Sequence, residues 1–119
     1  EVMMNHLDIA VVHEIIELAR LCYPIDGRSQ VVSTFRIDVD DNPETIALYQ
    51  KVASLSPEEL AELRALMLLG RHPNDQTSDD WDDLYTDSLA AQLQASVDYV
   101  ASKYQLAQYL QNGLTVLNL

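Results

Sequence analysis

Residues 55–71, which read LSPEELAELRALMLLGR, decide the fold class of this chain. Ser56 can cap a helix, Pro57 suits its first position, and Glu59 completes a capping box. Leucines recur at helical spacing through the run, and three successive apolar residues near its end cover every face. The pattern predicts a central helix that is buried at its C-terminal end and stops at Gly70, where a left-handed residue would terminate it.

Three further helical stretches follow from caps and apolar periodicity. Residues 8–23 predict a first amphipathic helix behind the cap Asp8, and residues 43–53 predict a second that begins with proline. Ser78 or Asp79 is expected to cap a long fourth helix with one continuous apolar line. That line consists of Trp81, Tyr85, Leu89, Leu93, Val97, Val100 and Tyr104.

The last stretch, residues 103–119, is expected to be helical again. A break is predicted either near Ser102 or at Gly113, because glycine weakens a helix interior. Residues 24–43 hold a strand-like apolar run, but the chain offers it no partner strand, so this stretch is interpreted as an irregular connection.

The predicted fold class is therefore all-α. We expect a single-domain bundle of four to five helices over residues 1–119, packed around the central helix, with one long irregular connection at about residues 24–43. Residues 1–4 are expected to be disordered or foreign to the domain.

Composition limits the partners of the chain. Nineteen acidic residues against seven basic ones give a net charge of −12, which argues against binding to nucleic acid or to an anionic membrane. Cys22 is the only cysteine, so an intrachain disulfide and a cysteine-rich zinc site are both excluded. The start of the chain lacks the pattern of a secretory signal, and together with the single cysteine this predicts a cytoplasmic location.

Two patterns resemble metal sites without meeting their requirements. His6 and His13 share a helix face, but two turns separate them by roughly 10 Å, too far for one ion. The acidic residues 38–42 imitate a calcium loop, yet Pro43 stands where glycine is needed and Tyr49 where glutamate is needed. We therefore expect no bound metal, and no motif in the sequence predicts a cofactor.

Arg71 and the acidic residues after it form the candidate site. We predict that Arg71 makes a structural salt bridge with Asp79, Asp80 or Asp83, whose position at a helix start is favourable without any function. The alternative is that Arg71, with His72 beside it, captures an anionic ligand or a carboxylate of a partner. No catalytic residue is predicted, because no nucleophile motif is present.

One helix ends in Leu69-Gly70-Arg71, and an acidic segment that contains tryptophan follows at residues 79–83. This combination resembles an uncharacterised proteobacterial family, a domain of unknown function. Residues 7–20 and 108–114 are similar to that family as well. The chain departs from it at His72-Pro73, where the family pattern has glycine and an acid. The resemblance implies one domain and a bacterial, cytoplasmic origin, and it implies no particular chemistry.

Two functions from different classes remain open. The first is a non-enzymatic protein-interaction module that also self-associates, because apolar residues occupy wide arcs on the first and fourth helices and six tyrosines offer interface material. The second is a small hydrolase or an anionic-ligand-binding protein that uses Arg71, His72 and the acidic residues 79–83. A flat apolar patch would favour the first function, and a concave anion site beside Arg71 would favour the second.

Overall fold

The computed structural model describes residues 4–22, 43–72 and 74–119, and within these ranges the chain is all-α, as predicted. The predicted irregular connection lies almost wholly outside the described residues. Six α-helices and one 3-10 turn make up the described part. Their bounds are α1 (Ile9–Cys22), α4 (Pro43–Ala53), α5 (Pro57–Arg71), η1 (Ser78–Asp80), α6 (Trp81–Ala90), α7 (Leu93–Ala101) and α8 (Leu106–Leu117).

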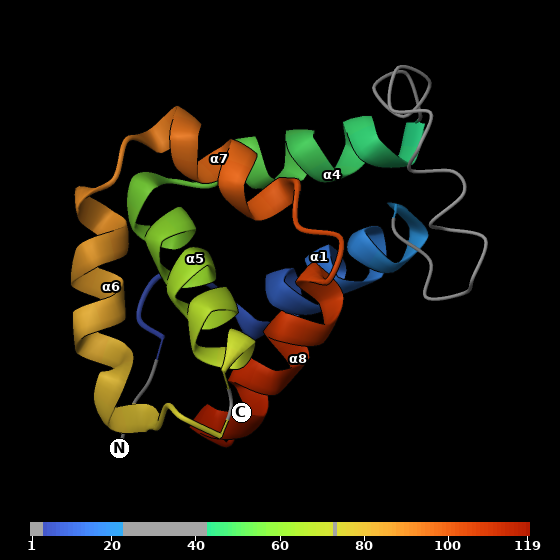
Figure 1. Cartoon of the computed structure of the whole chain (residues 1–119). Coiled ribbons are helices and arrows are strands. Elements are labelled where there is room, and N and C mark those ends of the chain that lie inside the picture. The colour runs from blue at the N-terminus through green and yellow to red at the C-terminus, as the bar shows by residue number, and fades with distance from the viewer. Residues whose placement is uncertain (1–3, 23–42, 73) are drawn as a thin grey trace.

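The central position predicted for α5 is confirmed. This helix packs against α6, α7 and α8, and Figure 1 shows it between α6 on one side and α8 on the other. Its start is the predicted capping box, in which Glu59 N–H donates to Ser56 Oγ at 3.1 Å and Ser56 N–H donates to Glu59 Oε1 at 2.8 Å. Both bonds satisfy backbone donors that the first turn of a helix leaves free.

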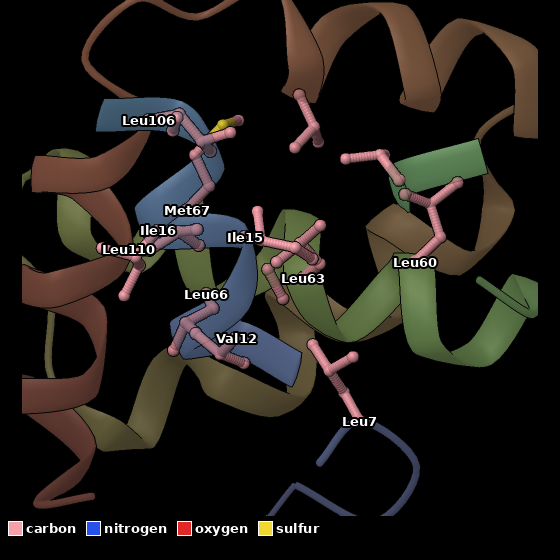
Figure 2. Packing of buried hydrophobic residues seen from close by; sticks show 14 of the residues in the cluster. Leu7, Val12, Ile15, Ile16, Leu60, Leu63, Leu66, Met67, Leu106 and Leu110 are labelled. Carbon is pink, nitrogen blue, oxygen red and sulfur yellow. The ribbon is translucent and has the colours of Figure 1, made fainter. Parts of the chain in front are cut away.

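Helix α1 closes the core from the other side, where it packs against α4 and α8. It begins as predicted behind Asp8, whose Oδ1 accepts the Ala10 N–H at 3.0 Å. Figure 2 shows its buried side chains meeting those of α5 and α8. Each such side chain contributes about 1.5–3 kcal/mol when it is fully buried. The labelled residues of these three helices are Val12, Ile15, Ile16, Leu60, Leu63, Leu66, Met67, Leu106 and Leu110.

Gly70 does not end α5, and this prediction is wrong. The helix continues through Gly70 to Arg71, with His72 following it, and the backbone of Gly70 is not left-handed. Of the two positions predicted for a later break, Gly113 is not the one used, because α8 runs through that residue. Each glycine lies inside a helix, so their role has to be found in the packing of the two helices.

The two glycines let the backbones of α5 and α8 touch. A methyl group at Gly70 would lie 2.6 Å from Gly113 N and would overlap the Tyr109 carbonyl oxygen. A methyl group at Gly113 would lie 2.9 Å from Leu66 Cδ1. Near the crossing, Asn112 Nδ2 donates to the Gly70 carbonyl at 3.2 Å, which satisfies an acceptor that the end of α5 would leave free.

The predicted long fourth helix is broken into two. Helix α6 ends at Ala90, and Ala91 and Gln92 adopt extended backbone conformations before α7 begins at Leu93. The break lets α7 fold back onto α4 and α5, where it buries one apolar face. Burial of that face outweighs the continued hydrogen bonding of a straight helix, and Leu89 is left 43% exposed beside the break.

The start of α6 and the end of α7 differ in how well they were predicted. Thr77, and not Ser78 or Asp79, caps the turn that leads into α6. The break predicted near Ser102 is confirmed, since α7 ends at Ala101 and α8 starts afresh at Leu106. None of the described helices has the length and apolar character needed to cross a membrane.

Candidate functional site

Arg71 pairs with a tyrosine and not with the acidic residues that were expected to be its partners. Its Nη1 donates to the Tyr99 hydroxyl on α7 at 3.0 Å. No ion pair joins Arg71 to any of the three candidate aspartates, all of which are described. The salt bridge that we predicted between the end of α5 and the start of α6 is therefore not formed in this structure.

The aspartates instead organise the start of α6. Asp80 Oδ2 accepts the Thr77 N–H at 2.9 Å, and Thr77 Oγ1 accepts the Asp79 N–H at 3.2 Å. Asp83 follows in the first turn of α6, where the helix dipole favours a carboxylate. His72 is exposed, and its carbonyl closes a turn by accepting two backbone N–H groups at 3.0 and 3.1 Å. These residues are thus engaged locally, and none of them forms a side-chain hydrogen bond or ion pair with Arg71 in the described part of the chain.

Arg64 is the second cation beside Tyr99. Its Cζ lies 5.1 Å from the centroid of the Tyr99 ring, within the range of a cation–π interaction. Its Nη1 donates to Oγ of Ser88, a buried residue of α6, at 3.3 Å. The Nε of Arg64 is buried and has no hydrogen-bond partner. The guanidinium is therefore held in place by two neighbouring helices but is only partly satisfied.

Lys103 is the third cation at the same ring. Its Nζ lies 4.3 Å from the ring centroid of Tyr99, which Arg64 Cζ approaches to 5.1 Å, so the two cations share one ring. We call this group the Tyr99 cluster; it consists of Arg64, Arg71, Tyr99 and Lys103. Three of the seven basic residues of the chain thus converge on a single side chain.

No described carboxylate forms a salt bridge with the cations of the Tyr99 cluster. Among the residues that the structure describes, the salt bridges are Arg20 with Glu17 at 2.7 Å and Lys51 with Glu14 at 3.3 Å. The carboxylate next to the cluster in sequence, Asp98, accepts a hydrogen bond from a glutamine of its own helix at 3.3 Å. In a chain of net charge −12, a group of three cations without a described carboxylate partner is unusual.

The positions of these side chains follow from the fold. Arg64 and Arg71 are seven residues apart, which is about two turns and places them on the same side of α5. Tyr99 reaches them because α7 packs against α5, and Figure 1 shows α7 running from the α6 side toward α8. Lys103 comes from the connection between α7 and α8. The cluster therefore depends on the break between α6 and α7.

The cluster can bind an oxyanion. Arg71 uses one of its five N–H donors on Tyr99, and no hydrogen bond from the Lys103 ammonium is formed with the described residues. The Tyr99 hydroxyl accepts from Arg71, so its own proton remains available for donation. Donors from two helices and one connection are thus gathered within reach of one ring.

Glu62 forms a second buried polar arrangement, on α5. It is 2% exposed, and its carboxylate accepts the backbone N–H groups of Asn5 at 2.8 Å, His6 at 3.0 Å and Leu7 at 2.6 Å. Three backbone donors compensate for the removal of this carboxylate from water. Glu62 thereby anchors the segment in front of α1 to the central helix.

His6 and Tyr85 complete that arrangement. Their rings are stacked, with centroids 6.4 Å apart and an interplanar angle of 13°. Burial raises the pKa of the Tyr85 hydroxyl, and the nearby carboxylates of Glu62 and Glu58 raise this pKa further. The neutral phenol is therefore favoured beside the anchored segment.

A family model described as "Protein of unknown function (DUF3775)" matches residues 46–119, which is more than half of the chain. The chain belongs to the DUF3775 family. The matched DUF3775 segment contains the whole Tyr99 cluster and Glu62, whereas α1 precedes it. The comparisons with curated proteins and with solved structures both give no match.

Of the four residues in the cluster, only Arg71 was predicted from the sequence as a site residue. A usable signal was present, since the seven-residue spacing of Arg64 and Arg71 puts both on one face of the central helix. Tyr99 and Lys103 carried no such signal, because their approach requires the break that the sequence did not predict. The part of the chain that the structure describes contains no group of three or more His, Cys, Asp or Glu residues arranged to hold a metal.

Proposed function

We propose that this DUF3775 protein is a non-enzymatic protein-interaction module that binds an anionic group of its partner at the Tyr99 cluster. The observation that carries the proposal is the convergence of three cations, none paired with a described carboxylate, on Tyr99. Cations in such an arrangement repel one another, and an incoming anion relieves that repulsion. Guanidinium groups are also well suited to carboxylate and phosphate oxygens.

The alternative of a hydrolase or ligand-binding site built from Arg71, His72 and the acidic residues 79–83 is less well supported. Arg71 is hydrogen-bonded to Tyr99, while Asp80 is used as part of a helix cap. The anion-binding part of that alternative is retained in the present proposal, at a different set of residues. The proposed setting is the cytoplasm of a bacterium.

Mutagenesis of the cluster tests the proposal. Immobilised wild-type protein should retain a partner from an extract of its native host, and the Arg71→Ala and Lys103→Ala variants should lose it. Lys51→Ala is the matched control, because it removes a cation that is already paired, with Glu14, outside the cluster. Equal retention of the partner by all four proteins would contradict a role for the cluster.

Self-association is the second part of the proposal. Leu89 and Leu93 are 43% and 48% exposed and lie on either side of the break between α6 and α7. Two large apolar side chains at one corner offer a contact for a second copy of the chain. Light scattering should give the mass of a dimer at micromolar concentration, and Leu93→Glu should reduce it to that of the monomer. A monomer mass for the wild type throughout this range would contradict self-association.

A further inference from the structure

We infer that the anion taken by the Tyr99 cluster is a phosphate monoester dianion, carried on a side chain of the partner protein. This inference rests on the proposed function and names the chemistry of the same site. The charged and titratable groups that face the ligand are Arg64 and Arg71 from α5, Tyr99 from α7 and Lys103 from the connection after α7. Ser88 approaches from α6 as the hydroxyl that holds Arg64.

The first argument is the charge balance. One carboxylate would cancel one of the three positive charges and leave two of them close together. A phosphorylated side chain carries a charge of about −1.5 to −2 at neutral pH, so it cancels most of the excess. This neutralisation acts on cations that share one ring, because Lys103 Nζ and Arg64 Cζ lie 4.3 and 5.1 Å from the centroid of Tyr99.

The second argument is the number and the separation of the donors. A phosphate monoester presents three strong acceptor oxygens, whereas a carboxylate presents two in one plane. The free donors of Arg71, Lys103 and Tyr99 come from separate elements and surround the ring edge and its face. Three oxygens in a tetrahedral arrangement can meet donors that approach from different directions.

The chain is rich in carboxylates, yet none of the described ones pairs with the cluster. The sequence contains nineteen acidic residues, and Asp98 is adjacent to Tyr99 along α7. Its carboxylate nevertheless accepts from Gln94, and no described carboxylate forms a salt bridge with the cluster. A site that its own carboxylates leave unpaired is better matched to an anion of higher charge.

The test compares two short peptides, one with a central phosphoserine and one with glutamate at that position, by calorimetry and by shifts of the amide resonances of α7. The phosphoserine peptide should bind about tenfold more tightly. Arg71→Ala and Lys103→Ala should each weaken it by about tenfold or more, whereas Lys51→Ala should leave its affinity unchanged. Circular dichroism checks that each variant is folded.

The pH dependence identifies the charge state of the ligand. The second pKa of a phosphate monoester is about 6, so affinity for the phosphoserine peptide should fall several-fold between about pH 7.5 and 5. Inorganic sulfate keeps its double charge over this range and serves as the control. Its binding should change little, and a parallel fall for sulfate would show that the protein is titrating, which would overturn the assignment of the dianion.

The remaining outcomes separate this inference from the proposed function. Equal binding of the glutamate peptide would overturn the phosphate assignment and leave an anion-binding interaction module in place. Binding of inorganic phosphate or phenyl phosphate as tightly as the peptide would support the phosphate chemistry and overturn its protein source. Absence of binding for every probe, or binding that Arg71→Ala does not weaken, would overturn the phosphate site.

Discussion

Replacing Gly70 by alanine tests the helix crossing next to which Arg71 is positioned. In an ordinary helix interior this change stabilises a protein by about 1 kcal/mol, because alanine is the better helix former. Here the added methyl carbon would lie 2.6 Å from Gly113 N and would overlap the Tyr109 carbonyl oxygen. Both are backbone atoms within α8, so neither can rotate away as the end of a flexible side chain would.

The expected cost follows from that distance. Carbon atoms in favourable contact are roughly 3.5–4 Å from their neighbours, so the helices would have to separate by about 1 Å at the crossing. Overpacking of this kind costs about 1–3 kcal/mol and occasionally more, and a backbone-to-backbone clash belongs at the upper end. After the gain in helix propensity is subtracted, Gly70→Ala should lower the free energy of unfolding by about 2 kcal/mol.

Urea unfolding followed by circular dichroism measures the effect. With a slope of about 1.5 kcal/mol per molar urea, the midpoint should fall by more than about 1 M. The double variant Gly70→Ala/Gly113→Ala should cost less than the sum of the single changes, because one separation of α5 and α8 accommodates both methyl groups. A midpoint that stays constant or rises in Gly70→Ala would refute the close crossing, and strict additivity would refute the shared interface.

Three further predictions concern polar residues. Glu62→Gln should lower the free energy of unfolding by about 2–3 kcal/mol, because the new NH₂ group faces a backbone donor. It should also remove the hydrogen-exchange protection of the amides of residues 5–7. The control Glu58→Gln should cost under about 0.5 kcal/mol in the same melts. Arg71→Ala should change stability by less than about 0.5 kcal/mol in urea melts, because the residue is exposed and its side chain bonds to a hydroxyl among the described residues. A loss of more than about 1 kcal/mol would return Arg71 to a structural role. Because the pKa of Tyr85 is raised in the folded protein, its contribution to stability is complete below the ordinary pKa of 10.0 and is lost as the pH rises through the raised value. Tyr85→Phe should therefore flatten the alkaline fall in stability seen in thermal melts. An unchanged fall would contradict this.

Features that depend on local chemistry were predictable from the sequence. The capping box of Ser56 and Glu59 and the cap at Asp8 are formed by residues within three positions of one another, so no tertiary information is needed to recognise them. The all-α class follows from the same local signals. Glu62 was beyond their reach, because its three partners lie more than fifty residues away in sequence.

The glycines show why a correct local rule can fail. Gly70 follows an apolar run and precedes a loop, which is the usual setting of a helix terminator. The same residue is also required wherever two backbones touch, and its partner in that contact, Gly113, is 43 positions further along the chain. One sequence cannot distinguish these two uses of glycine, because the difference lies entirely in the second helix.

The break between α6 and α7 had even less local signal. Ala90, Ala91 and Gln92 all favour helix, so propensity predicts that the helix should continue. Packing of α7 onto α4 and α5 decides otherwise, and the same packing brings Tyr99 to the two arginines of α5. The candidate site was therefore only as predictable as the break, which is why Arg71 alone was recognised and was assigned to the wrong partner.

The contrast between Glu62 and the Tyr99 cluster bears on function. A buried polar group that serves stability is expected to be hydrogen-bonded, and Glu62 meets this expectation with three backbone donors. The cluster does the opposite, because Arg64 Nε is buried without a partner and Lys103 meets only the face of a ring. Mutual repulsion of the three cations opposes their cation–π and hydrogen-bond contacts with Tyr99. This difference in hydrogen bonding is what motivates the proposal that the cluster binds an anion.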